Sequence, residues 1–200
     1  MNDSTPKLNI IRLKGKYILP YIEHLAKLRL GIFKDYPYLY AGDLEYEMHY
    51  LETYIKCPES VMVIALDGNQ VVGASTSMPL EFEDRVFQTP FLTAGMKIQD
   101  IFYLGESVLQ PAYRGQGTYK YFFKEREAAA REYGAQYTAF CAVERPLNHP
   151  QKPENYIPLD AVWNRFGYQK HPKLHTQFKW KEIGEENASP KTMVFWLKKI

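Results

Sequence analysis

One segment of the chain combines residue types that could bind an anion. Residues 103–118 read Tyr-Leu-Gly-Glu-Ser-Val-Leu-Gln-Pro-Ala-Tyr-Arg-Gly-Gln-Gly-Thr, so that Arg114, Gly115 and Gly117 separate an apolar run from a helix-forming stretch. Glycine at such a turn lets the backbone approach a ligand closely. The first amides of a helix have no partner within the helix and lie at the positive end of its dipole. We therefore expect a phosphate or pyrophosphate site here, with the guanidinium of Arg114 adding positive charge.

Two common phosphate-binding motifs do not fit this turn. The loop that binds nucleoside triphosphates has Gly, four residues and then Gly-Lys-Ser/Thr, and this pattern is absent. The dinucleotide fingerprint has a third glycine three residues after the second, and Lys120 occupies that position. A Gly-x-Gly turn alone is weak evidence, so a turn without any ligand is the competing interpretation.

The residues around the turn resemble a known family. The pattern Val108-x-x-Pro-x-Tyr-Arg-Gly-Gln-Gly117 resembles the coenzyme A loop of the GNAT acetyltransferase superfamily, and residues 163–168, Trp-Asn-Arg-Phe-Gly-Tyr, resemble the ending of that family's fourth helix. The resemblance implies a coenzyme A site made of Val108, Leu109, Arg114, Gly115, Gln116, Gly117 and Thr118. The amides of residues 115–118 would hold the pyrophosphate, and the backbone of residues 108 and 109 would pair with the pantetheine arm.

The resemblance also implies a reaction, in which an acceptor amine attacks acetyl-CoA directly and no covalent enzyme intermediate forms. Direct attack needs a base for the amine and an acid for the leaving thiolate. Glu106 is the candidate base, because it shares a strand face with Leu104 and Val108, and apolar neighbours raise the pKa of a carboxyl group. A carboxylate that only binds a cationic acceptor is the alternative. The family's usual acid, a tyrosine, aligns with Trp163, whose indole has no acidic proton, so Tyr156 is the candidate acid.

The resemblance and the residues together lead to one expected function and two alternatives. We expect an acetyl-CoA-dependent N-acetyltransferase that acts on a primary amine of a small molecule or a protein. A non-catalytic coenzyme-A-binding domain with a regulatory or interaction role is the first alternative, and transfer of a longer acyl group is the second. We expect no metal ion, and a homodimer through the final strands is plausible.

Hydrophobic periodicity predicts an α/β fold. The predicted strands are residues 8–13, 61–66, 71–76, 100–109, 137–143, 173–180 and 192–198, and the predicted helices are residues 17–33, 43–56, 117–133 and 159–166. Residues 79–99 lack a pattern and are interpreted as a long excursion. The resemblance implies that the strands form a mixed, centrally splayed β-sheet flanked by helices, as in acyl-CoA N-acyltransferases of the GNAT type.

Three tyrosines of the second predicted helix share one face. Tyr46, Tyr50 and Tyr54 stand at i, i+4 and i+8. A buried amphipathic stripe is the favoured interpretation, and an aromatic wall beside an acceptor site is the alternative.

Composition excludes several other classes of protein. The length of 200 residues suits one domain, residues 1–200, and the net charge of +2 (25 basic minus 23 acidic groups) gives no field strong enough for nucleic acid or an anionic membrane. Cys57 and Cys141 are too few for a disulfide framework or a tetrahedral zinc site, and we expect them to be reduced core thiols. Residues 1–7 lack the apolar stretch of a signal peptide, and no run approaches the roughly 20 apolar residues of a membrane span. We therefore expect a cytoplasmic protein.

Overall fold

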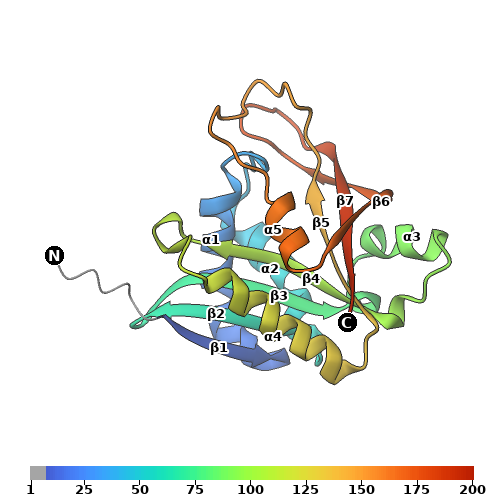
Figure 1. Ribbon diagram of the computed structural model, residues 1–200. Helices are drawn as coiled ribbons and strands as arrows, with labels where there is room; N and C mark the ends of the chain where they lie inside the picture. The colour runs from blue at the N-terminus through green and yellow to red at the C-terminus, as the bar shows by residue number, and fades with distance from the viewer. Residues whose placement is uncertain (1–7) are drawn as a thin grey trace.

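Seven strands form one mixed sheet in the computed structural model of the chain, which describes residues 8–200 (Figure 1). The strand order is β1-β2-β3-β4-β5-β7-β6, and only the pair β4–β5 is parallel. The strands are β1 (Asn9–Lys14), β2 (Val61–Asp67), β3 (Gln70–Pro79), β4 (Ile101–Leu109), β5 (Tyr137–Val143), β6 (Gln169–Trp180) and β7 (Ser189–Lys199). The expectation about a signal peptide in residues 1–7 lies outside the described residues.

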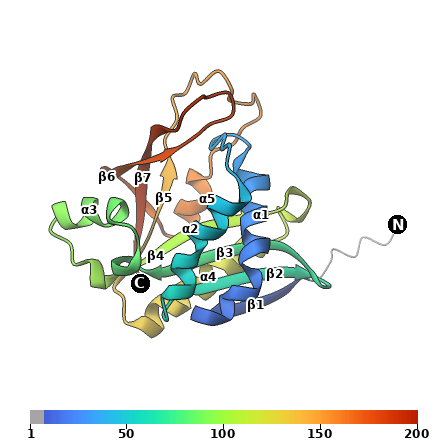
Figure 2. The same ribbon diagram turned by 180° about the vertical axis from the view of Figure 1, so that it is seen from behind.

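Helices cover both faces of the sheet. They are α1 (Ile22–Phe33), α2 (Leu44–Lys56), α3 (Arg85–Thr93), α4 (Thr118–Tyr133) and α5 (Asp160–Arg165). In Figure 1 α4 lies in front of the sheet, whereas Figure 2, seen from behind, brings α1 and α2 to the front. Among the described residues, no helix has the length and apolar character that crossing a membrane requires.

Alternation along the central strands explains this two-sided covering. On β2, Met62 and Ile64 pack with the residues of α1 and α2, while Val61 and Val63 pack with those of α4. Successive side chains of a strand point to opposite faces, so an uninterrupted apolar run fills both layers of the core. Both cysteines are buried and free, as expected for core thiols.

The sheet opens between β4 and β5. Only Ile101–Tyr103 of β4 pairs with β5, through residues 137–139, and the two strands then separate. From residue 104 to Leu109, β4 keeps a partner on one side alone, in β3. This confirms the expected mixed sheet with a central splay, and it leaves one edge of β4 without a strand partner beside the opening.

Two predictions of secondary structure were wrong. Residues 79–99 were expected to be irregular, but they contain α3, whose first turn is capped by the Asp84 carboxylate accepting from the amide of Val86 at 3.2 Å. Pro90 lies inside this short helix and hides its pattern, because proline interrupts a typical helical sequence. The helix expected from residue 17 begins as a 3₁₀ turn over Gly15–Tyr21 and becomes α-helical only at Ile22.

Candidate functional site

The glycine-rich turn joins the end of β4 to the start of α4. After a 3₁₀ turn over Pro111–Tyr113, Gly115 and Gly117 take φ values of 76° and 82°, and α4 begins at Thr118. These angles belong to the left-handed region, which glycine adopts without the steric cost that other residues incur. A side chain added at either glycine would meet no atom within 4 Å, so both face open space.

The backbone amides of this turn are unused within the protein. Among residues 8–200, no protein acceptor is hydrogen-bonded to the amides of Gly115, Gln116, Gly117 or Thr118. The side chain of Arg114 ties the turn to the end of β4, because its Nε donates to the carbonyl of Leu109 at 3.1 Å. The structure therefore places four free N–H groups at the positive end of a 16-residue helix.

The carboxylate of Glu106 lies on the face of the sheet that α1 and α2 cover. Its Oε1 accepts from the hydroxyl of Thr76 at 2.5 Å, and its Oε2 forms an ion pair with Arg29. The expectation that Glu106 shares a strand face with Leu104 was wrong, because Leu104 packs in the core cluster of α4, whereas Val108 packs in that of α1 and α2. The register between β3 and β4 shifts between Ser75 and Ser77, so strict alternation fails at this point and the carboxylate meets polar partners.

Arg29 joins two buried carboxylates. Its guanidinium forms ion pairs with Glu106 and with Glu47, and it lies over the rings of Phe33 and Tyr50 at 5.1 and 4.9 Å from their centroids. Burial alone would lower the pKa of Arg29, but the charges of Glu106 and Glu47 raise it well above its ordinary value. The result is a fixed, charged cluster between α1, α2 and β4.

Comparison with solved structures identifies the fold of the chain. A ribosomal-protein-alanine N-acetyltransferase from Brucella melitensis matches with a TM-score of 0.59 at 15% identity, over 95% of this chain and 99% of that chain. The protein yncA from Salmonella typhimurium, solved with its cofactor acetyl-CoA, matches with a TM-score of 0.59 at 10% identity, over 96% and 94%. A polyamine N-acetyltransferase from Drosophila melanogaster, which forms N-acetylagmatine, matches with a TM-score of 0.58 at 10% identity, over 96% and 100%.

The chain has the GNAT acetyltransferase fold. Identities this low establish the fold alone. No family model matches the sequence, and no curated protein matches it either.

A third buried carboxylate in this GNAT fold follows β3. Glu83 is only 5% exposed, and its Oε2 accepts from the amide of Asp84 at 2.9 Å. Its Oε1 has no hydrogen-bond partner within the described part of the chain. Burial raises the pKa of Glu83 to about 7, with further increases from Glu106 and Asp84 and opposition from the Asp84 amide and from Arg29. Sequence analysis missed this residue because it lies in the segment without a pattern.

The shifted pKa of Glu83 predicts how stability depends on pH. Since the folded protein binds a proton up to about pH 7 and an unfolded chain only to about 4.5, the folded state holds more protons between these values. Relative to a Glu83→Gln variant, the free energy of unfolding should fall by roughly 3 kcal/mol as the pH rises from about 5 to 8. Urea unfolding of both proteins at the two pH values measures this difference. Equal pH dependence in the two proteins would contradict the burial of an ionisable group here.

Tyr156 lies in the long loop between β5 and α5 of the GNAT fold. Its half-buried ring meets Tyr36 edge-on, with centroids 4.7 Å apart, and burial together with Tyr36 raises its pKa. Trp163 donates its indole N–H to the hydroxyl of Tyr119 at 3.3 Å. No hydrogen bond joins Tyr156 to Glu106 among residues 8–200, so the structure does not bring the two predicted catalytic side chains into direct contact.

The three tyrosines of α2 have different environments. Tyr54 is fully buried, Tyr50 is half-buried against Arg29, and Tyr46 is 51% exposed. The buried stripe is therefore confirmed at Tyr54 and wrong at Tyr46.

The close approach of Tyr54 requires glycine on β4. A Cβ atom at Gly105 would overlap the hydroxyl of Tyr54 and lie 2.5 Å from Thr76 Oγ1. We expect Gly105→Ala to lower the free energy of unfolding by about 1–3 kcal/mol, as overpacking does. Gly31→Ala is the matched control, because Gly31 in α1 faces open space and alanine favours a helix by about 0.5–1 kcal/mol. Urea denaturation compares the two, and unchanged stability in Gly105→Ala would refute the close approach.

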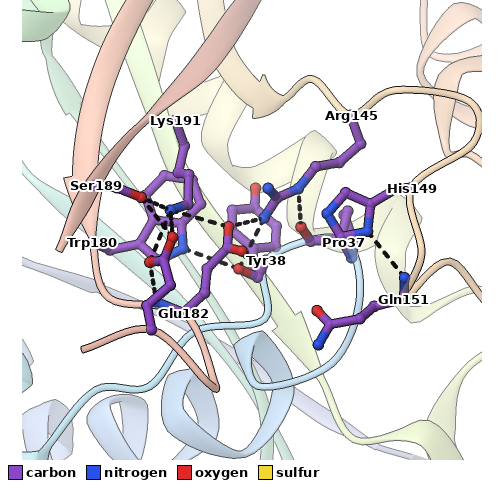
Figure 3. Close-up of polar contacts among 10 residues, drawn as sticks. Pro37, Tyr38, Arg145, His149, Gln151, Trp180, Glu182, Ser189 and Lys191 are labelled. Atoms are coloured by element: carbon purple, nitrogen blue, oxygen red, sulfur yellow. Dashed lines mark hydrogen bonds and ion pairs between the residues drawn. The ribbon is translucent and has the colours of Figure 1, made fainter. Parts of the chain in front are cut away.

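A polar network holds the loop between α1 and α2 in place (Figure 3). Arg145, which follows β5, donates to the carbonyls of Pro37 at 2.7 Å and Tyr38 at 3.2 Å, and it pairs with Glu182 at 2.5 Å. Lys191 of β7 lies 3.4 Å from the same Glu182 carboxylate. The loop is thereby fixed to the strands on the far side of the sheet opening. No sequence pattern indicated the hydrogen bonds from Arg145 to the carbonyls of Pro37 and Tyr38, which lie 108 and 107 positions away.

Proposed function

We propose that the chain is an acetyl-CoA-dependent N-acetyltransferase that transfers an acetyl group to a primary amine of a small molecule or a protein by direct attack. One observation carries this proposal. The strand β4, whose edge is unpaired at the opening toward β5, is followed directly in the chain by the turn with four free amides at the start of α4. A solved structure with this fold contains acetyl-CoA, which supports the same assignment.

The donor side of the proposed site binds acetyl-CoA through the backbone. The amides of Gly115, Gln116, Gly117 and Thr118 hold the pyrophosphate, because anions are stabilised at a helix N-terminus. The unpaired edge of β4 near Val108–Leu109 binds the pantetheine arm as an added strand would. The open space at both glycines of the turn fits a bulky diphosphate. Arg114, exposed beside the turn, adds a positive charge.

The acceptor side lies near the Arg29 cluster. Glu106 is the proposed base for the amine, and binding of a cationic amine is its alternative role. Arg29 is shared between Glu106 and Glu47, so one cation faces two carboxylates, and this arrangement supports the attraction of a cationic acceptor. Tyr156 is the proposed acid for the leaving thiolate, since a phenol is protonated at neutral pH and has a proton to donate. We expect the protein to act in the cytoplasm, where its two buried thiols stay reduced.

The test is turnover of acetyl-CoA by the full chain. Purified protein is incubated with acetyl-CoA and one amine in each reaction. The amines are agmatine, an aromatic monoamine and a peptide with a free N-terminal alanine. The proposal predicts release of free thiol that depends on one of these amines, with the acetylated amine detected by mass spectrometry. Coenzyme binding without thiol release from any amine would favour the non-catalytic domain instead. Faster release from a longer acyl-CoA would favour transfer of a larger acyl group.

A further inference from the structure

Arg126 of α4 is a buried cation that forms no ion pair. Its side chain is 2% exposed, and the ring centroid of Phe123 lies 5.2 Å from its guanidinium carbon. No carboxylate oxygen of residues 8–200 lies within 4.0 Å of its guanidinium nitrogens. Burial lowers the pKa of Arg126, but an arginine stays charged at neutral pH. Since a buried charge without a counter-ion is costly, the contacts that it makes instead need an explanation.

The guanidinium of Arg126 binds three backbone carbonyls. Its Nε donates to Phe122 in the preceding turn of α4 at 3.1 Å. Its Nη1 donates to the carbonyls of Thr76 on β3 and Glu106 on β4, both at 3.3 Å. One nitrogen therefore joins two strands, and the planar fork of donors that arginine presents allows the third bond at the same time.

Arg126 binds these strands at the point where their register shifts. Between two paired positions, β3 contributes one residue, Thr76, and β4 contributes two, Gly105 and Glu106. An extra residue of this kind disrupts the ladder and bends the strand that carries it. The two bonds from Nη1 therefore stabilise the backbone of the sheet where the regular pairing between β3 and β4 is interrupted.

The two residues that Arg126 holds also contact each other through the side chain of Glu106. Thr76 Oγ1 donates to Glu106 Oε1 at 2.5 Å, and it accepts from the amide of Glu106 at 3.4 Å. This contact lies on the face covered by α1, which carries Arg29, whereas α4 covers the opposite face (Figures 1 and 2). A side chain on one face thus fixes the backbone from which a carboxylate extends on the other.

We propose that Arg126 is a positioning residue, which fixes the direction of the Glu106 carboxylate toward the acceptor amine by holding the carbonyls of Thr76 and Glu106. This inference rests on the proposed function, in which Glu106 is the base or binds a cationic amine. Arg126 acts through the backbone and exchanges no proton with the acceptor. Because α4 also begins at the four free amides, one helix connects the proposed diphosphate site with the carboxylate on the acceptor side.

The first test needs no substrate. Hydrogen exchange of the backbone amides is measured by NMR in the unchanged chain, in Arg126→Met and in Arg131→Met. Arg131 is the matched control on the same helix, because its exposed side chain pairs with Glu127 at 3.6 Å. We expect the Glu106 amide to exchange about tenfold faster in Arg126→Met, since two hydrogen bonds at the register shift are lost, and to keep its rate in Arg131→Met. Equal exchange at Glu106 in all three proteins would overturn the inference.

The second test is a double-mutant cycle on kcat/KM, with the amine that the thiol-release assay identifies. Rates are expressed per molecule that binds coenzyme A, which removes any effect of unfolded protein. We expect Arg126→Met to lower kcat/KM about 100-fold, the cost of a displaced reacting group, with an unchanged Kd for coenzyme A. In a Glu106→Gln background the same replacement should cause no further loss, because the group that Arg126 positions is already absent. Arg131→Met should leave kcat/KM unchanged in both backgrounds.

Arg126→Lys keeps both tests decisive if the methionine variant does not fold. Lysine retains the charge but presents a single nitrogen, so it should recover part of the slow exchange and part of kcat/KM. A loss of kcat/KM in Arg126→Met that is equally large with Glu106 and with Gln at that position would overturn the inference. So would an unchanged kcat/KM in Arg126→Met, which leaves the proposed function intact. If no amine supports turnover by the unchanged chain, the proposed function itself fails, and the role of Arg126 toward the acceptor fails with it.

Discussion

Replacing Arg29 by methionine is expected to lower the free energy of unfolding by about 3–5 kcal/mol, the largest loss of stability that the structure predicts. Arg29 is the shared partner of Glu47 and Glu106, which are 0% and 6% exposed. Methionine fills a similar volume but leaves both carboxylates buried without their cation. Leaving a charge buried and uncompensated costs far more than the loss of a surface pair, because water cannot replace the missing partner.

The matched control for Arg29→Met is Arg12→Met. Arg12 lies at the surface, where it pairs with Glu132 of α4 at 2.6 Å. Exposed ion pairs contribute about 0–1 kcal/mol, so this variant should unfold almost as the unchanged chain does. Urea unfolding monitored by circular dichroism measures both. Losses of equal size in the two variants would contradict the buried cluster.

Replacing Gly117 by tryptophan is expected to weaken coenzyme A binding about 1,000-fold. The side chain would enter the open space in front of the free amides, and charge-assisted hydrogen bonds of the kind proposed for the pyrophosphate contribute about 1.5–3 kcal/mol each. Isothermal titration calorimetry with coenzyme A measures the change in Kd.

Gly134→Trp controls for backbone strain in this experiment. Gly134 ends the same helix with φ of 91°, close to the 82° of Gly117, and it also faces open space. Both variants therefore introduce the same side chain at a left-handed position of α4, but only Gly117 adjoins the free amides. Equal affinities in the two variants would show that the start of α4 is not the binding site.

The donor half of the candidate site could be predicted from the sequence because it is local. The strand, the two glycines and the helix follow one another over residues 101–133, and each is recognised from its own residues. Two backbone positions at positive φ, Gly115 and Gly117, occur where the turn requires them. The opening between β4 and β5 followed from the resemblance rather than from any pattern in those strands.

The acceptor half could not be predicted because its contacts are not local. Arg29 contacts the carboxylate of Glu47, 18 residues away, and that of Glu106, 77 residues away. No pattern within any one of these three segments predicts its contact with the others. Apolar neighbours were expected at Glu106 because side chains alternate along a regular strand. The register shift between β3 and β4 interrupts this alternation, so the expectation failed there. Glu83 was missed because Pro90 obscures the helix that follows it.

The most direct test of the account follows the backbone amides at the start of α4. In a ¹H–¹⁵N NMR titration of the folded chain with coenzyme A, the amide signals of Gly115, Gln116, Gly117 and Thr118 should move in a saturable way, together with those of the free edge of β4 up to Leu109. This result would show the diphosphate bound to the four unused N–H groups. A folded protein whose amide signals at these positions stay unchanged at millimolar coenzyme A would contradict the account.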